Sequence, residues 1–401
     1  MRTAKLKDIT LTITDGKHGD CKNHDGSGYY FISCKDVYDE TIHYENARQI
    51  TEDDFRDADR RTNLAAYDIL ITNSGTIGRM ALVKDIPETR KTTFQKSVAI
   101  VRADTSQVVP NYLYYLLKSK VHDFINSSNG SAQKNLLLST MRDFDISFVD
   151  SFETQHRIAS ILSRYDSLIE NYQKQIKLLE EAAQRLYKEW FVDLRFPGHE
   201  NTKIVDGVPE GWEKKSIGEI GTVITGKTPS TSNKENYGGS IPFITIPDMH
   251  TGIYPVSSVF LSEKGAESQS KKYIPQGALI VSCIGTAGLV CITKERCQTN
   301  QQINSLILDD KEMLHYMYFV FLSLKEHLNN IGSNGATMTN VNKSKFEGID
   351  IVVPSSCIIR DFSQRTTPYF ENIKSLQSQL RLLTEARDRL LPKLMSGEIT
   401  V

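Results

Sequence analysis

Short apolar runs separated by glycine-rich turns occur along the whole chain, and one such pattern occurs twice. YDILITNSGTIGRMALV, residues 67–83, consists of an apolar run, a Gly-Thr-x-Gly segment (Gly75–Gly78) and a second apolar run. GALIVSCIGTAGLVCIT, residues 277–293, has the same three parts around Gly285–Gly288. Apolar runs bounded by Gly and Asn are typical of strands joined by tight turns. The pattern predicts a strand, a turn and a strand in each half of the chain.

Further matches follow in the same order in the two halves. The matched pairs are YYFISCKD (29–36) with IPFITIPD (241–248), NYLYYLL (111–117) with HYMYFVF (315–321), SNGSAQKN (128–135) with SNGATMTN (333–340), and DISFV (145–149) with DIVVP (350–354). Because the order is kept and the spacing changes little, the sequence predicts a tandem duplication.

Each half combines β-branched and aromatic runs with one amphipathic helix, predicted near residues 111–126 and again near 312–330. A much longer helix ends each half. Strands and helices do not alternate as they do in doubly wound folds. We therefore predict an α+β fold with two tandem-repeat mixed α/β domains, separated by two long helices that form an antiparallel coiled coil. The predicted segments are 1–151 and 197–356 for the domains, and 152–196 and 357–401 for the helices.

Heptad spacing over more than four repeats supports the coiled coil, because a globular domain seldom presents so long a pattern. Ser151 is the predicted N-cap of the first helix, Pro197-Gly198 its end, and Ser396-Gly397 the end of the second. The polar residues Gln175 and Arg387 also fall on the pattern. The predicted interface consists of Ile158, Ile161, Tyr165, Leu168, Tyr172, Leu179, Leu186, Ile373, Leu376, Leu380, Leu383 and Leu390. Two ordinary helices that pack on their own domains remain the alternative.

A two-fold axis between two copies of one unit would make the long helices antiparallel and place the domains at opposite ends of a rod. About 35 helical residues at 1.5 Å each give a separation of roughly 50 Å. A heptad inserted near Gln175 would then lengthen that separation.

Composition places few limits on function. The 401 residues carry 48 basic and 49 acidic side chains, for a net charge of −1, and the mean hydropathy is −0.35. Six cysteines contain no CxxC pair, and no run reaches the roughly 18 apolar residues of a membrane span. We expect a reduced, cytoplasmic protein that binds no membrane. Because the net charge is close to zero, any phosphate contacts are expected from local clusters such as Lys343 with Lys345.

Candidate catalytic motifs are weak. GTVITGKT, residues 221–228, matches the Walker A pattern, but polar residues precede it and Pro229 begins a loop where a helix is required. There is no adenine-methyltransferase tetrapeptide of the Asn/Asp-Pro-Pro-aromatic type, and the nine histidines show no metal-ligand spacing. The sequence therefore predicts neither an enzyme nor a cofactor bound by this chain.

Polar loops occur instead at equivalent places in the two halves, and their sequences differ while the surrounding framework matches. They contain Lys, Asn, Gln, Ser and Thr, which hydrogen-bond phosphates and base edges; simple solvated turns are the alternative. The candidate DNA-binding residues, taken from these loops and from nearby lysine clusters, are Lys17, His18, Lys22, Asn23, Lys91, Lys96, Gln133, Lys134, Asn135, Lys227, Thr228, Ser230, Lys271, Lys272, Thr339, Asn340, Asn342, Lys343 and Lys345.

The whole chain resembles the specificity (S) subunits of type I restriction-modification systems. The resemblance rests on the helix sequence of residues 154–198, the lead-in VPEGWEKKSIGEI (208–220), the ending LLTEARDRLLPKLMSGEI (382–399), the Gly-Thr-x-Gly turns and NQQIN (300–304). The first repeat departs from the pattern, because it lacks the Pro-Glu-Gly-Trp lead-in.

The resemblance implies a non-catalytic subunit whose two target recognition domains each read one half of a bipartite double-stranded DNA sequence. It also implies that the helices act as a spacer and dock two modification subunits, which bring S-adenosylmethionine, and two restriction subunits where present, which bring ATP and Mg²⁺. A two-armed coiled-coil scaffold for protein partners, without DNA readout, is the alternative.

Overall fold

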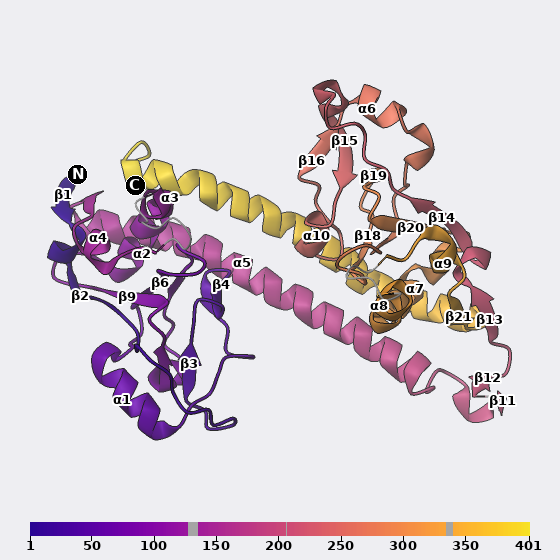
Figure 1. The fold of residues 1–401 in the computed structure, drawn as a ribbon, viewed down its shortest axis with the longest axis horizontal. Coiled ribbons are helices and arrows are strands. Elements are labelled where there is room, and N and C mark those ends of the chain that lie inside the picture. The colour runs from indigo at the N-terminus through magenta and orange to yellow at the C-terminus, as the bar shows by residue number, and fades with distance from the viewer. Residues whose placement is uncertain (127–134, 206, 334–339) are drawn as a thin grey trace. The chain divides into compact units, whose positions relative to one another are not determined.

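The computed structural model describes residues 1–126, 135–205, 207–333 and 340–401, which form two units. The first unit comprises Met1–Leu168 and Leu383–Val401, and the second comprises Ile169–Leu382. Each unit contains most of one predicted repeat together with a part of each long helix (Figure 1).

The first unit is built around a four-stranded antiparallel sheet with the strand order β2-β9-β6-β7. Strand β1 pairs with β10, β4 pairs with β5, and β3 pairs in parallel with β8. The strands are β1 (Arg2–Lys5), β2 (Thr10–Asp15), β3 (Tyr30–Ile32), β4 (Val37–Tyr38), β5 (Thr41–Ile42), β6 (Ile69–Thr72), β7 (Met80–Leu82), β8 (Thr92–Phe94), β9 (Val98–Ala103) and β10 (Asp145–Phe148). The helices are α1 (Glu52–Thr62), α2 (Pro110–Ser119), α3 (Val121–Asn126) and α4 (Leu138–Arg142).

The second unit repeats this topology, with a four-stranded sheet in the order β14-β20-β17-β18, a β13–β21 pair and a parallel β15–β19 pair. Its strands are β11 (Ile204–Val205), β12 (Val208–Pro209), β13 (Glu213–Ser216), β14 (Gly221–Thr225), β15 (Tyr237–Ile244), β16 (Val259–Leu261), β17 (Leu279–Ser282), β18 (Val290–Ile292), β19 (Gln298–Thr299), β20 (Ile303–Leu308) and β21 (Asp350–Val353). Its helices are α6 (Glu263–Glu267), α7 (Leu314–Ser323), α8 (Lys325–Ser333) and α9 (Lys343–Glu347). The shared strand order confirms the duplication.

The central strands are continuous apolar runs because both faces of each sheet are covered. In β6, Ile69 and Ile71 belong to one hydrophobic core, while Leu70 belongs to another on the opposite face. In β17, Leu279 and Ile280 divide between two cores in the same way. Successive side chains of a strand point to opposite faces, so a strand buried on both sides has no polar alternation.

The Gly-Thr-x-Gly segments form the predicted turns. Gly75 and Gly78 have φ of 77° and 86°, and Gly285 and Gly288 have φ of 76° and 90°. These are left-handed conformations that glycine adopts without steric cost. Each turn joins two paired strands, β6 to β7 and β17 to β18.

The prediction of one amphipathic helix per repeat was wrong, because each is broken into two. Helix α2 ends at Ser119 and α3 begins at Val121, and α7 and α8 are separated in the same way at Leu324. A Cβ at Gly78 would lie 2.8 Å from the Val121 side chain, and one at Gly288 would lie 2.6 Å from Lys325. The second short helix therefore begins in close contact with the glycine turn, a tertiary contact that helical periodicity does not reveal.

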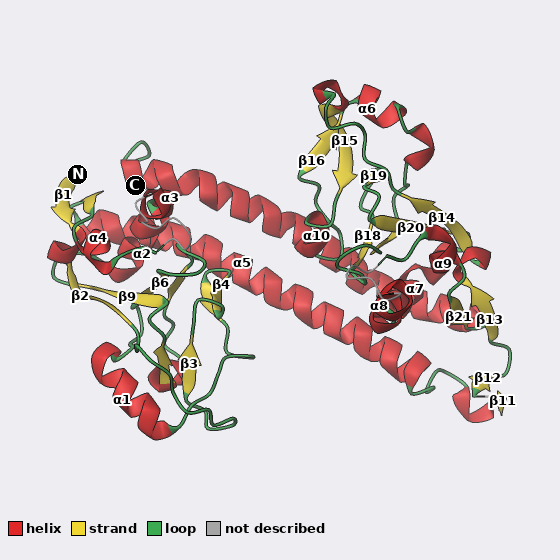
Figure 2. Ribbon diagram, viewed as in Figure 1, coloured by secondary structure: helices red, strands yellow, loops and turns green. Residues whose placement is uncertain are grey.

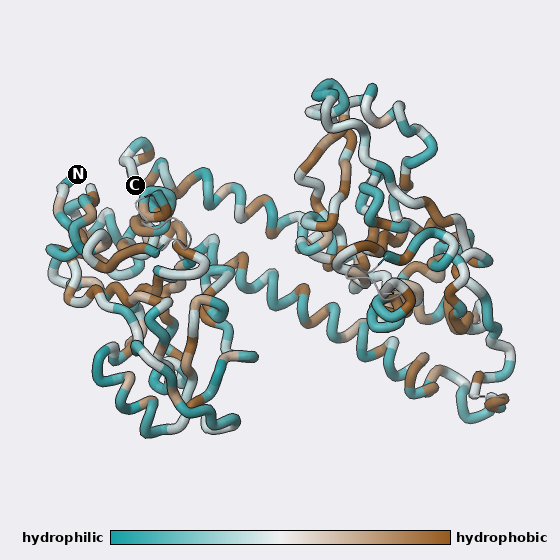
Figure 3. Tube along the Cα trace, viewed as in Figure 1, coloured by the Kyte–Doolittle hydropathy of each residue, from teal (hydrophilic) through white to brown (hydrophobic). Residues whose placement is uncertain are grey.

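Two long helices take part in both units. Helix α5 spans Phe152–Tyr187 and continues into a π-helical turn at Lys188–Val192, and α10 spans Ser356–Ser396. The Thr154 amide donates to the Ser151 hydroxyl at 3.3 Å, as predicted for an N-cap. Both helices alternate between hydrophilic and hydrophobic residues in Figure 3. Over the described residues, no helix is long and apolar enough to cross a membrane.

The helices pair in the antiparallel sense within each unit. In the first unit, Ile158 near the start of α5 shares a core with Leu394 near the end of α10. In the second unit, Ala183 near the end of α5 shares a core with Phe370 near the start of α10. These cores also contain sheet residues, so each helix packs on the domains as well as on its partner.

The buried positions of the helices differ in part from the heptad prediction. Leu168 is 42 % exposed, whereas Leu162, Ile176 and Ala183, outside the predicted set, are buried. Ile158 and Ile373 are buried, and the other predicted interface residues are partly buried: Ile161, Tyr165, Tyr172, Leu179, Leu186, Leu376, Leu380, Leu383 and Leu390. An α-helix drifts relative to a seven-residue repeat, and α5 changes from one core to another along its length.

Candidate nucleic-acid interface

In both units, the loops that carry many of the predicted DNA-binding residues leave the four-stranded sheet at the same edge. In the first unit the register joins Asp15 to Ala99, Thr72 to Val98 and Ile71 to Met80. In the second it joins Thr225 to Asn304, Ser282 to Ile303 and Val281 to Val290. We name these edges the turn edges; they comprise residues 16–29, 73–79 and 95–97 in the first unit, and 226–236, 283–289 and 300–302 in the second (Figure 2).

The turn edge of the first unit brings together Lys17, His18 and Lys96. The Lys96 amide donates to the Lys17 carbonyl at 3.1 Å. Lys17 Nζ is paired with Asp57 Oδ2 of α1 at 2.9 Å, and this hydrogen bond raises the pKa of Lys17. His18 Nε2 lies 2.9 Å from Asp15 Oδ2. Lys96 is exposed and forms no ion pair with the residues that the structure describes, so its charge is available to meet a phosphate.

The turn edge of the second unit carries Lys227, Thr228 and Ser230. Lys227 is exposed, and its amide donates to the Thr299 carbonyl at 2.9 Å. The Thr228 hydroxyl donates to Gln301 Oε1 at 2.5 Å, which connects the two neighbouring loops of this edge.

Lys271 and Lys272 come from the segment that precedes β17. Lys272 Nζ donates to the Thr225 carbonyl at 2.9 Å and so supports the end of β14, whereas Lys271 is exposed. Of the predicted lysines near this edge, Lys272 therefore has a structural role, whereas Lys227 and Lys271 face solvent.

Asn135 and Asn340 lie at the turn edges of the two units. Asn135 forms a β-bridge with Ser74, and Asn340 forms the equivalent bridge with Ile284. Each bridge contacts the start of a Gly-Thr-x-Gly turn, and both asparagines are exposed. The predicted contacts Gln133, Lys134 and Thr339 lie outside the described residues.

Three predicted residues of the first unit lie around α1. The Lys22 amide donates to Asp54 Oδ2 at 2.6 Å, and Asn23 accepts a hydrogen bond from Arg48. Lys91 Nζ lies 5.7 Å from the centre of the Tyr29 ring. These contacts attach the polar loop to α1 and place Lys91 beside Tyr29.

Three predicted residues of the second unit belong to α9 and have structural partners. Asn342 caps this helix by accepting from the Lys345 amide at 2.9 Å. Lys343 lies 3.4 Å from Glu347, and Lys345 Nζ donates to the Ile331 carbonyl at 2.9 Å. Because these three side chains already have partners within the chain, fewer of their polar groups are available to bind DNA.

Arg79 and Gln301 are candidate contacts that the sequence pattern did not identify. Arg79 is exposed immediately after Gly78. Gln301 belongs to the NQQIN segment between β19 and β20. The adjacent amide side chains of that segment were the available signal, because amides bind base edges.

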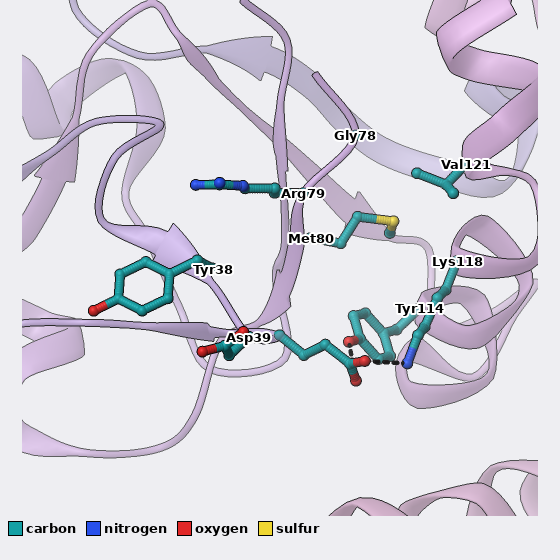
Figure 4. Close-up of a pocket in the computed structure, with 9 residues that line it drawn as sticks. Tyr38, Asp39, Gly78, Arg79, Met80, Tyr114, Lys118 and Val121 are labelled. Carbon is teal, nitrogen blue, oxygen red and sulfur yellow. Dashed lines mark hydrogen bonds and ion pairs between the residues drawn. The ribbon is translucent and has the colours of Figure 1, made fainter. Parts of the chain in front are cut away.

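A pocket of about 240 Å³ lies beside the turn edge of the first unit. Its lining residues are Tyr38, Asp39, Glu40, Gly78, Arg79, Met80, Tyr114, Lys118 and Val121. The Glu40 carboxylate accepts a hydrogen bond from the Tyr114 hydroxyl at 3.4 Å and lies 2.6 Å from Lys118 Nζ. In Figure 4, the Arg79 side chain extends away from Tyr114 and Lys118. The only cation of the lining without an ion pair to a described residue is Arg79.

The Walker A match does not form a phosphate loop. Gly221–Thr225 is strand β14, and the following residues cross the turn edge without starting an α-helix. Across the described residues, no three His, Cys, Asp or Glu side chains gather as metal ligands would.

Comparison with known proteins gives the family. The family described as "Type I restriction modification DNA specificity domain" matches residues 3–181 and 209–364. The HindI specificity subunit of Haemophilus influenzae is 34% identical over 369 residues, covering 75% of this chain and 80% of that protein. The MjaIX specificity subunit of Methanocaldococcus jannaschii is 30% identical over 391 residues, covering 95% and 89%.

A solved structure shows the same fold. The S subunit of a type I restriction-modification system from M. genitalium superposes with a TM-score of 0.64 at 16% identity, covering 98% of this chain and 96% of that one. The chain therefore belongs to the family of type I restriction modification DNA specificity domains, with one domain in each repeat, and it recognises a DNA target rather than catalysing a reaction.

Proposed function

We propose that the two turn edges each read one half of a bipartite double-stranded DNA target. The observation that carries this proposal is that the same sheet and the same edge are built twice, while the loops on them differ in sequence. A constant framework with variable loops suits two readers with different targets. Lys96 and Lys227 would contact phosphates, and Gln301 a base edge.

We also propose the partners. The helices α5 and α10 would set the separation of the half-sites and dock two modification subunits, with two restriction subunits where present. S-adenosylmethionine, ATP and Mg²⁺ would be bound by those subunits, and the assembly would act in the cytoplasm. The type I restriction enzymes named for the relatives support this class of partner over a DNA-independent scaffold.

Lysine substitutions test the reading edge. Lys227→Ala should lower the slope of log affinity against log salt by about 1, because one phosphate contact is lost. Lys214→Ala is the matched control, since Lys214 is also exposed but lies in β13 of the separate two-stranded β13–β21 sheet. Binding of the chain with its modification subunit is measured on a duplex that carries the mapped methylation site. Equal slopes for the two variants would refute the assignment of this edge.

Gln301→Ala separates base reading from phosphate binding. Loss of a base contact should cost about 1–3 kcal/mol on the cognate duplex and leave non-specific binding unchanged. An equal loss on both duplexes would show that Gln301 reads no base.

Helix length tests the spacer. Seven residues inserted both after Leu168 in α5 and after Leu382 in α10, at the boundary between the units, leave the contacts within each unit intact. The insertion adds about 10 Å, or roughly three base pairs of unread spacer. Sequencing of methylated sites reads the spacer directly, and an unchanged spacer would rule out this role of the helices.

A further inference from the structure

A buried ion-pair network in the first unit joins the end of α10 to three other elements. The Arg387 side chain is 7% exposed, and its Nη1 lies 2.7 Å from Asp166 Oδ1 of α5 and 2.9 Å from Glu40 Oε2 between β4 and β5. Asp166 also accepts a hydrogen bond from the Tyr115 hydroxyl of α2, and Glu40 pairs with Lys118. Burial opposes the charge of Arg387, but Asp166 and Glu40 outweigh burial and raise its pKa.

The second unit has apolar side chains at the equivalent positions. Alignment of LLEEAAQRL (178–186) with LLTEARDRL (382–390) places Ala183 where α10 has Arg387. Continued towards the helix starts, the same alignment places Phe370 at the position of Asp166, and the match of NYLYYLL with HYMYFVF places Phe319 at that of Tyr115.

These three residues form a packed apolar cluster. Ala183 is fully buried, Phe370 is 1% exposed and Phe319 is 5% exposed. The Phe319 and Phe370 rings are 6.0 Å apart, within the range of favourable aromatic contact. The second unit therefore has an uncharged cluster at the position where the first unit has the ion-pair network.

Duplication makes the assembly of such a chain ambiguous. The end of α5 and the end of α10 are related in sequence, and each must pack on the correct unit. In an exchanged pair, the end of α5 would lie on the first unit of a second copy of the chain. Exchange of equivalent elements between copies is a common route to unwanted dimers.

We propose that Glu40, Asp166 and Tyr115 form an acceptor surface that selects the Arg387-bearing end of α10 and rejects the equivalent end of α5, so that two copies do not exchange helices. In an exchanged pair, Ala183 would leave Asp166 without its guanidinium. Arg387 would meet Phe319 and Phe370 without an anion. The second mismatch buries an unpaired guanidinium, and the first leaves the Asp166 carboxylate, whose side chain is 27% exposed, with the Tyr115 hydroxyl but no cation. An unpaired buried charge is far more costly than a paired network is stabilising.

Refolding of two tagged copies tests the acceptor surface. Full-length chains with different affinity tags are unfolded together, refolded by dilution and passed over both affinity columns in turn. The mixed-tag fraction is the share of the protein that both columns retain, which contains two exchanged copies. The variant Tyr115→Phe/Asp166→Phe/Arg387→Ala gives the first unit the residues of the second. Its mixed-tag fraction should exceed that of the wild type by about tenfold, and light scattering should give twice the 45.3 kDa of one chain.

A second buried ion pair in the same unit controls for general loss of stability. Arg102 Nη2 lies 2.6 Å from Asp68 Oδ2, away from both long helices. The variant Asp68→Leu/Arg102→Met should keep the mixed-tag fraction of the wild type. Equal fractions for the wild type and the triple variant, or an equal rise in the triple and the control variants, would overturn the proposal.

A single substitution in α5 keeps the test decisive if the triple variant does not refold. Ala183→Arg gives α5 the side chain that the acceptor surface selects, and Ala183→Met gives it similar bulk without charge. The mixed-tag fraction should rise several-fold more for Ala183→Arg, since only the arginine gains an acidic partner by exchange. Equal fractions for the two variants would contradict selection by charge.

Discussion

His315 makes the stability of the second unit depend on pH. It is the second residue of α7, it is 7% exposed, and its ring stacks on Phe370 of α10 at 4.1 Å and 7°. Its Nδ1 lies 2.9 Å from the Thr366 hydroxyl, which donates its own proton to the Phe362 carbonyl at 2.8 Å. Nδ1 must therefore be the donor, and an added proton would go to Nε2.

Burial lowers the pKa of His315 to about 4. The position near the N-terminus of α7 also disfavours a cation, because the helix dipole is positive there. The unfolded chain, with a histidine pKa near 6.5, takes up this proton at a higher pH than the folded chain does. The free energy of unfolding therefore decreases as the pH falls from about 6.5 towards about 4. Between about pH 7.5 and about pH 5, the contribution of His315 to this decrease is about 2 kcal/mol.

Urea unfolding of His315→Asn measures this contribution. Asparagine keeps a donor near the Nδ1 position without a titrating ring, and Asn111 stands at the equivalent place in the first repeat. Both tryptophans, Trp190 and Trp212, belong to the second unit, so their fluorescence reports its unfolding. The wild type should lose about 2 kcal/mol more than His315→Asn between the two pH values.

Exposed His250, in the same unit, provides the matched control. His250→Asn should keep the pH dependence of the wild type. If the wild type and His315→Asn lost equal free energy on acidification, His315 would not carry the proton linkage, and the reasoning from its burial would be refuted.

Two further predictions concern the stability of the first unit. Gly78→Ala should lower the free energy of unfolding by about 1–3 kcal/mol and lower the melting temperature, because φ is 86° and the new Cβ would lie 2.8 Å from Val121. Gly19→Ala should cost less, since Gly19 has φ of 106° but open space around it. Equal losses for the two variants would contradict the role of the Val121 contact. Gln155→Leu should cost about 2–4 kcal/mol, because the buried Gln155 accepts from the Val109 amide at 2.8 Å and donates to the Val149 carbonyl at 2.7 Å. In urea unfolding followed by far-ultraviolet circular dichroism, which reports the helices and strands of both units, exposed His156→Leu in the same unit should change stability by less than about 0.5 kcal/mol, and a similar effect of both substitutions would argue against the buried hydrogen bonds as the cause.

Local patterns predicted the elements that depend on local chemistry. The continuous apolar runs of β6 and β17, the glycine turns that follow them, the start of α5 and the end of α10 could be predicted from neighbouring residues. The predicted end of α5 at Pro197-Gly198 was wrong, because the helix ends at Tyr187 and its π-helical turn at Val192. The repeat also predicted the common topology of the two units, because segments of similar pattern in the same order adopt the same fold.

The candidate interface was predictable only in outline. The polar loops were found, but charge alone did not separate exposed Lys96 and Lys227 from Lys17 and Lys345, whose Nζ atoms already have partners. Those partners, Asp57 and the Ile331 carbonyl, lie well away in sequence and become neighbours only through the fold.

The sequence by itself determined the duplication, the two long amphipathic helices and the family. Only the tertiary structure decided which helix positions are buried, where α2 gives way to α3, and why an arginine stands on the apolar face of α10. The spacing of Arg387 matches a leucine position, and its acceptability there depends on Asp166 and Glu40, which no local pattern connects to it. Periodicity records which side of a helix faces a core, whereas the identity of the groups across that core is settled by contacts between distant segments.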